Sequence, residues 1–163
     1  MIMSEYTVIL QVPGYLQQWM YHDFGTPVEL LRDGPESRLL NELLRKNPEE
    51  PESGETVLPE DEESGEKLVD VAVKIPWFKS KDARTFNYLS SYGKTAMVDS
   101  FKTLFKKDLL NSVGNLRNVN CKQVTLIYNY MEEHGISEDH WDSVKQIYYR
   151  NKKRYLTKNN IKT

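Results

Sequence analysis

The chain has 163 residues and a formal net charge of −2, and its single cysteine, Cys121, excludes an internal disulfide. A chain of this length can bury a core without a disulfide or a metal. No apolar run approaches the roughly 18 residues that a membrane span needs, and the N-terminus lacks the basic start of a secretory signal. We therefore expect a cytoplasmic protein with no membrane role, in which Cys121 is a packing residue.

The charge is divided sharply along the sequence. Residues 1–46 carry six acids and four bases, residues 47–66 carry nine acids and no base, and residues 67–163 carry nine acids and eighteen bases. This division predicts an N-terminal strand and helix segment, an acidic mobile linker or loop, and a strand followed by a basic helical region. Such asymmetry points to a polyanionic partner for the basic part, or to pairing of the two parts within the chain.

Alternating apolar residues predict two strands, near residues 6–12 and 68–75. The inward positions are filled mostly by β-branched residues: Val8, Leu10 and Val12 in the first, and Val69, Val71, Val73 and Ile75 in the second. If the two strands pair, the acidic segment is a loop within one sheet. Residues 27–31 are a further possible short strand.

Apolar residues at helical spacing predict helices at residues 15–24 and 36–46, with Gly25 ending the first and Pro35 opening the second. Ser137 is a typical N-cap residue for the last helix. The basic region is expected to contain about three helices, at residues 94–110, 121–134 and 137–156. The predicted class is α+β, with a small sheet and a helical C-terminal region.

The first candidate site is the basic end of the chain, because no acid follows Asp142. Lysine and arginine neutralise phosphates, and tyrosines can stack or bond to the nucleic-acid backbone. A solvated helix end, where cations complement the helix dipole, is the alternative. The candidate nucleic-acid contacts here are Lys145, Tyr149, Arg150, Lys152, Lys153 and Arg154.

A second basic group surrounds aromatic residues in the middle of the sequence. Trp77 and Phe78 adjoin Lys79, Lys81 and Arg84, a mixture typical of single-strand binders. The alternative is that the aromatic residues pack into the core while the cations face water. Three further candidates follow in the next predicted helix: Lys102, Lys106 and Lys107.

The turn Gly135-Ile136-Ser137 joins two amphipathic helices, as in a helix-turn-helix. In that motif the start of the second helix enters the major groove. Here that start carries Glu138, Asp139 and Asp142, which phosphate would repel. We therefore expect the turn but not major-groove reading, and any DNA contact should come from the end of the last helix.

No local pattern predicts catalysis or metal binding. His134 and His140 are six positions apart across a turn, which matches no standard ligand spacing, and His22-Asp23 is an isolated pair at the end of a predicted helix. The sequence also lacks a glycine-rich phosphate loop and a nucleophile motif. We expect no enzymatic activity, no metal and no cofactor.

Two stretches carry a resemblance to known sequences. One runs from Ile75-Pro76-Trp77-Phe78-Lys79 into Lys81–Leu89, and the other covers Leu126–Ile136 with Trp141, Tyr148, Arg150 and Tyr155 beyond it. Over roughly residues 67–156 the chain resembles small uncharacterised proteins carried on phages and mobile elements of gut bacteria. The resemblance implies a role beside a replicating or transferring DNA element, without an activity to transfer.

The sequence thus predicts a non-enzymatic nucleic-acid-binding accessory protein, which contacts the phosphate backbone through its basic C-terminal surface. The acidic segment is expected to compete with nucleic acid for that surface. The alternative is a protein–protein interaction or assembly module without a nucleic-acid role. A homodimer formed through residues 6–12, or docking at the Trp77-Phe78 patch, is the form expected for that alternative.

Overall fold

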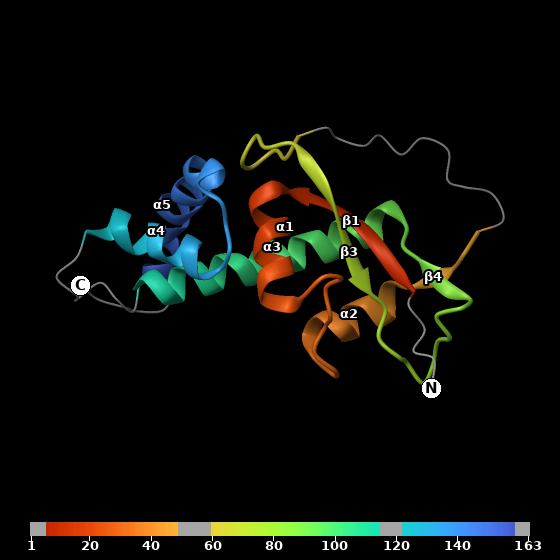
Figure 1. The fold of residues 1–163 in the computed structure, drawn as a ribbon. Helices are drawn as coiled ribbons and strands as arrows, with labels where there is room; N and C mark the ends of the chain where they lie inside the picture. Colours follow the sequence, from red (N-terminus) through yellow and green to blue (C-terminus); the bar gives the residue numbers. More distant parts are fainter. Residues whose placement is uncertain (1–5, 49–59, 115–121, 159–163) are drawn as a thin grey trace.

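The sheet at the centre of the computed structural model joins two distant parts of the chain (Figure 1). The structure describes residues 6–48, 60–114 and 122–158, with side chains only up to residue 152 in the last range. β1 (Thr7–Pro13) pairs antiparallel with β3 (Leu68–Lys74), which places Leu10 opposite Val71. Both side chains are fully buried. The two predicted strands and their pairing are confirmed.

The helices gather around and beyond this sheet (Figure 1). In the described residues the α-helices are α1 (Gly14–Phe24), α2 (Pro35–Leu43), α3 (Ser91–Gly114), α4 (Gln123–Glu133) and α5 (Trp141–Lys158). A short 3₁₀ helix, η1 (Glu138–His140), leads into α5. A small sheet and mostly C-terminal helices confirm the α+β class. None of these helices has both the length and the apolar character that crossing a membrane demands.

The helix expected at residues 36–46 is too long, because α2 ends earlier and β2 (Arg45–Lys46) follows it. Lys81 explains the end of α2, since its Nζ donates to the carbonyl oxygens of Asn41 and Leu44, the latter at 2.8 Å. Carbonyl groups in a last helical turn have no partner within the helix. The ammonium group supplies that partner, and β2 then pairs with β4 (Phe86–Tyr88).

The possible strand at residues 27–31 is reduced to a single bridge beside β3. Val28 pairs in parallel with Val73, through hydrogen bonds of 2.9 Å from Val28 N to the Ala72 carbonyl and from Lys74 N to the Val28 carbonyl. The Val28 side chain is fully buried. This segment therefore covers part of one edge of β3 but does not form a third strand.

One apolar core connects the sheet to the C-terminal helices. The longest apolar row lies on α3, at positions one helical turn apart: Met97, Phe101, Phe105 and Leu109. The centre of the Phe105 ring is 5.1 Å from that of Tyr15 on α1 and 6.3 Å from that of Tyr130 on α4. The N-terminal segment and the basic helical region are thus packed together through α3.

The turn between α4 and α5 has the expected caps. Gly135 follows α4 with a φ of 69°, a conformation that favours glycine. The Ser137 hydroxyl accepts a 3.3 Å hydrogen bond from the backbone N–H of Asp139, which confirms Ser137 as an N-cap. Val144 of α5 is fully buried.

Candidate functional site

The basic residues singled out from the sequence lie in two separate groups. Figure 1 places the connection between β3 and β4, which carries Lys79, Lys81 and Arg84, at the opposite end of the molecule from α5. The other group lies on α3 and α5. A single surface containing all the candidate cations therefore does not form.

The group between β3 and β4 is partly used for internal contacts. Lys81 ends α2, as described, and Arg84 pairs with Asp82 at 2.8 Å. That ion pair holds the pKa of the Asp82 carboxyl below its usual range. Lys79 is exposed beside Trp77, and both line an open hollow of about 530 Å³. Trp77 is 76% exposed, so the alternative in which the aromatic residues pack into the core is wrong for this residue.

The described end of the acidic segment, residues 60–66, forms a turn that we call the acidic turn. Asp61 organises it: its backbone N–H donates to the Glu66 carbonyl at 2.8 Å, and its carbonyl accepts from Gly65 at 2.7 Å. Its carboxylate accepts from both the backbone N–H and the hydroxyl of Ser64, at 2.9 and 2.8 Å. Residues 60–66 therefore have a defined conformation at the start of β3.

The acidic turn lies against α3 and α5. Lys102 Nζ is 2.6 Å from Asp61 Oδ1, and Lys106 Nζ, one helical turn further along α3, is 2.8 Å from Glu63 Oε1. Arg150 of α5 donates to the Glu63 carbonyl at 3.1 Å. Cations from two helices thus converge on one short acidic stretch, which is the pairing within the chain that the divided charge suggested.

The buried end of this contact is the pair of Asp61 and Lys102, whose side chains are 4% and 18% exposed. Burial on its own raises the pKa of the Asp61 carboxyl. Hydrogen bonds from Lys102 and Ser64 outweigh that effect and hold the pKa below its usual range. Glu66 also contacts His140. A Cβ atom at Gly14 would lie only 2.6 Å from Cε1 of that imidazole, so the backbone passes close to it.

The basic surface continues from Arg150 along α5. Arg150 lines an open hollow of about 610 Å³ with Lys145 and Tyr149, and Tyr149 is 42% exposed. Lys145 lies 6.0 Å from the centre of the Trp141 ring, within reach of a cation–π contact. We call the following set the cationic face: Lys102, Lys106, Lys145, Tyr149 and Arg150.

The other candidates on these helices lie around the cationic face. Lys107 is exposed on α3. Lys152 donates to Gln123 at 2.9 Å, which ties α5 to the start of α4. Lys153 and Arg154 belong to α5, but their side chains lie outside the described part of the structure, as does Cys121.

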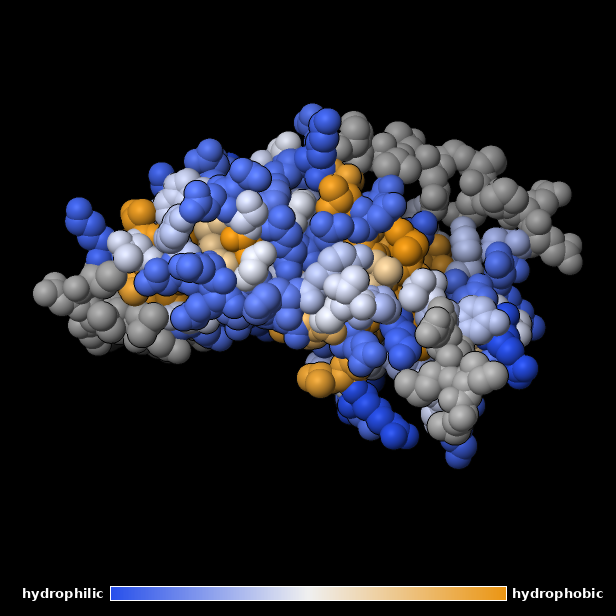
Figure 2. Space-filling model, viewed as in Figure 1, coloured by the Kyte–Doolittle hydropathy of each residue, from blue (hydrophilic) through white to orange (hydrophobic). Residues whose placement is uncertain are grey.

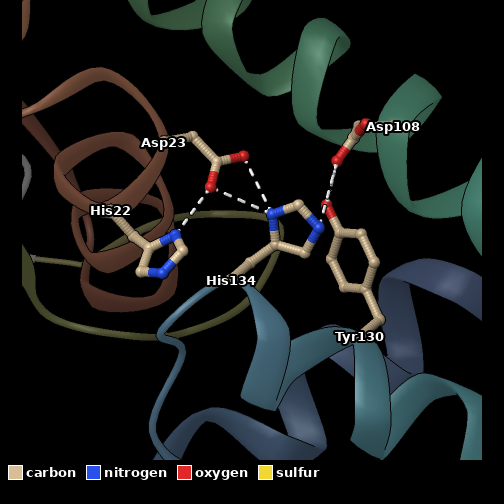
Figure 3. Close-up of polar contacts among 5 residues, drawn as sticks. All are labelled: His22, Asp23, Asp108, Tyr130 and His134. Carbon is tan, nitrogen blue, oxygen red and sulfur yellow. Dashed lines mark hydrogen bonds and ion pairs between the residues drawn. The ribbon is translucent and has the colours of Figure 1, made fainter.

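A second polar cluster joins the ends of α1 and α4 (Figure 3). Asp23 Oδ1 is 2.9 Å from His22 Nδ1, and both Asp23 carboxylate oxygens contact His134 Nδ1, at 3.0 and 2.8 Å. One carboxylate therefore serves two imidazoles. We call His22, Asp23 and His134 the histidine cluster.

Two residues support the histidine cluster from behind His134 (Figure 3). Asp108 of α3 places Oδ2 3.8 Å from His134 Nε2, and the Tyr130 hydroxyl donates to the same oxygen at 2.6 Å. Burial and the neighbouring Asp108 carboxylate raise the pKa of the Tyr130 phenol, so it keeps its proton. The centres of the Tyr130 and His134 rings are 4.2 Å apart, and this contact restricts the orientation of the imidazole.

Local spacing did not reveal this cluster, because His134 is 111 positions away from Asp23. His134 and His140, which are close in sequence, have different partners: Asp23 for His134 and Glu66 for His140. The available signal was positional. Each half of the cluster lies at the end of a helix, within three residues before Gly25 or Gly135.

Comparisons with protein families, with curated proteins and with solved structures find no match to this chain.

Proposed function

We propose that this protein is a non-enzymatic nucleic-acid-binding accessory protein that contacts the phosphate backbone through the cationic face. One observation carries the proposal: Lys102, Lys106 and Arg150, from two helices, together hold the oxygen atoms of the acidic turn. The ammonium and guanidinium groups that bind the carboxylates and the carbonyl of this turn can also donate hydrogen bonds to phosphate oxygens.

The chemistry of the cationic face suits a chain of phosphates better than a single anion. Lys106 and Arg150 extend the positive charge from α3 to α5, and Lys145 continues it along α5. Tyr149 adds an exposed ring beside these cations, which can bond to a phosphate or stack on a base. The contacts would depend on charge and would carry little sequence specificity.

The acidic turn would compete with nucleic acid for part of this face. The Asp61–Lys102 pair is buried and anchors the turn, whereas Glu63 and Lys106 have side chains that are 25% and 29% exposed. The Glu63–Lys106 pair is the more open of the two to solvent, and solvent-exposed ion pairs stabilise by only about 0.2–1 kcal/mol. Glu63 is therefore the member of the turn that a polyanion can displace without unfolding it.

Titration of labelled duplex and single-stranded DNA at several salt concentrations tests the proposal. Each phosphate contacted should add about −0.9 to the slope of log affinity against log salt for a duplex. Lys106→Ala and Arg150→Ala should each weaken binding and reduce that slope by about one. Arg84→Ala, in the distant group, is the matched control and should change neither. Absence of binding at low salt would refute the proposal.

Competition by the acidic turn has its own matched pair of variants. Glu63→Gln and Glu62→Gln each remove one negative charge from the same turn, but Glu63 is the one that meets Lys106. Glu63→Gln should tighten DNA binding by up to about fivefold, since the contact it removes is worth at most about 1 kcal/mol. Equal effects of the two substitutions would contradict direct competition.

The mobile-element part of the proposal is supported by the sequence resemblance over residues 67–156. The exposed cations of α5 fall inside that stretch, as does Trp77. An accessory role beside a transferring DNA element requires the DNA binding tested above, so the two parts of the proposal fail together if binding is absent.

One observation favours the alternative, a protein–protein interaction module. Leu31 and Trp77 are 75% and 76% exposed, and exposed tryptophan is enriched at protein interfaces. Figure 2 shows a mostly hydrophilic face on which apolar residues gather in small separate groups. A second copy of the chain is the partner to test first, by light scattering with Trp77→Ala as the variant. A dimer that this substitution dissociates, together with no DNA binding, would favour the alternative.

A further inference from the structure

We propose that the histidine cluster binds a Zn²⁺ ion that fastens α1 to α4. His22, Asp23 and His134 each offer a ligand atom, and these atoms all lie within 4.8 Å of one another. Two imidazoles and one carboxylate form a donor set that Zn²⁺ accepts, with a fourth position for water. Imidazole nitrogen disfavours Mg²⁺ and Ca²⁺, which select oxygen ligands.

The contacts of Asp23 with the two imidazoles require only a small opening to admit the ion. In a tetrahedral zinc site, with bonds of about 2.0–2.2 Å, neighbouring ligand atoms lie roughly 3.3–3.6 Å apart. Asp23 Oδ1 is now 2.9 Å from His22 Nδ1 and 3.0 Å from His134 Nδ1. The two Asp23 contacts are therefore within a few tenths of an ångström of the separations in a zinc site, and the two imidazoles, whose ligand atoms lie within 4.8 Å of each other, would adjust around the ion.

The surroundings of His134 match those of a metal-bound histidine. When Nδ1 binds a metal, the Nε2–H typically donates to a carboxylate, which fixes the tautomer and the ring orientation. Asp108 Oδ2 lies 3.8 Å from His134 Nε2, an ion-pair distance that must shorten to form this hydrogen bond, and is itself held by the Tyr130 hydroxyl. Stacking of the Tyr130 ring on His134 holds the imidazole in this direction. Asp108 is thus a positioning residue for the site.

The backbone brings the two halves of the cluster together at Gly135. A Cβ atom at this position would lie 2.8 Å from His22 Cδ2, so a glycine is needed where α4 ends against α1. The His22 side chain is 50% exposed, while Asp23 and His134 are about one-fifth exposed, at 22% and 21%. An ion from solvent can therefore reach the cluster, and a water molecule can complete its coordination.

Calorimetric titration of the chelator-treated full chain with ZnCl₂ tests the proposal directly. We expect one ion per chain. Zinc at a free concentration a hundred times its Kd should raise the Tm by about 5–10 °C for a domain of this size. Co²⁺ in place of Zn²⁺ should give the visible absorption of a tetrahedral site with nitrogen and oxygen ligands.

The three histidines of the chain provide a matched set of variants. His22→Gln and His134→Gln should abolish stoichiometric zinc binding and the rise in Tm, and the exposed position of His22 makes its substitution compatible with folding. His140→Gln, in which the imidazole that contacts Glu66 is lost, should leave both unchanged. Asp108→Asn should keep one ion per chain but weaken its binding about 10–100-fold.

Two outcomes would overturn the proposal. If the wild-type chain takes up no zinc, the cluster is a set of histidine–aspartate hydrogen bonds that join two helices. If zinc binds equally well to wild type, His22→Gln and His134→Gln, the ion occupies another place on the chain. Neither result decides whether the chain binds DNA, because the cationic face contains none of these residues.

Discussion

The acidic turn and the histidine cluster both tie an earlier segment of the chain to the C-terminal helices, but they use charge differently. In the acidic turn, Asp61 and Glu63 each have a lysine of α3 as partner, and Asp61 is almost fully buried. In the histidine cluster, one carboxylate is shared by two imidazoles, and His22 is half exposed. A buried and matched ion pair anchors the fold, whereas the histidine cluster, with two imidazoles that can act as ligands and an open side at His22, has room for a cation.

The largest effect should come from removing the buried lysine of the acidic turn. Lys102→Met leaves the Asp61 carboxylate buried without its cation, and we expect a loss of about 3 kcal/mol in the free energy of unfolding. Urea denaturation measures this loss. Lys107→Met, at an exposed position on the same helix, should stay within about 0.5 kcal/mol of wild type. Similar losses in both variants would mean that Asp61 does not anchor the turn.

A smaller effect is expected where the histidine cluster depends on the backbone. Gly135→Ala places a Cβ against His22 and forces a non-glycine residue to a φ of 69°. We expect a loss of about 1–3 kcal/mol, together with weaker zinc binding. Gly114→Ala is the control, because its Cβ would meet nothing within 4 Å. Full stability and full zinc affinity in Gly135→Ala would show that the close approach is dispensable.

The Asp61–Lys102 pair should also affect the pH dependence of the free energy of unfolding. A carboxyl group whose pKa is lower in the folded state stabilises the fold above its unfolded pKa, and this contribution is lost as the pH falls through the folded pKa. Asp61 is such a group, so the wild type should lose stability below about pH 4. Asp61→Asn should lose less over the same range in urea denaturation. If the free energy of unfolding falls with pH in the same way in wild type and in Asp61→Asn, the loss does not come from Asp61.

The smallest effect on stability is expected at the exposed end of the acidic turn. Glu63→Gln should lower the free energy of unfolding by less than about 1 kcal/mol, and the difference should shrink at high salt. The same substitution is expected to tighten DNA binding, so stability and affinity should move in opposite directions. A loss as large as that of Lys102→Met would make Glu63 part of the anchor rather than a displaceable competitor.

Local patterns were sufficient for β1, β3 and most of the helices of this fold. Alternation at Val8, Leu10 and Val12 predicts a strand because it reports directly which face is buried. Gly25 and Ser137 predict helix ends because their conformations and side chains act within a few residues. The end of α2 was beyond such reasoning, since Lys81, far along the chain, supplies the partner for its last carbonyl groups.

The candidate sites needed the tertiary structure. The divided charge correctly suggested that acidic and basic parts meet, because charge asymmetry is visible in the sequence. It did not tell which lysines meet which acids, since Asp61 and Lys102 are 41 positions apart. Local patterns placed the two halves of the histidine cluster at helix ends but could not pair them, because they are joined only when α1 and α4 pack against α3.

α3 belongs to both sites at once. It carries Lys106 to the acidic turn and Asp108 to the histidine cluster, two positions further along one rigid helix about 36 Å long. Two sites that share a rigid element can be linked, and any such coupling is reciprocal. Zinc at one site would then alter the affinity of the other for DNA, and DNA would alter the affinity for zinc by the same factor.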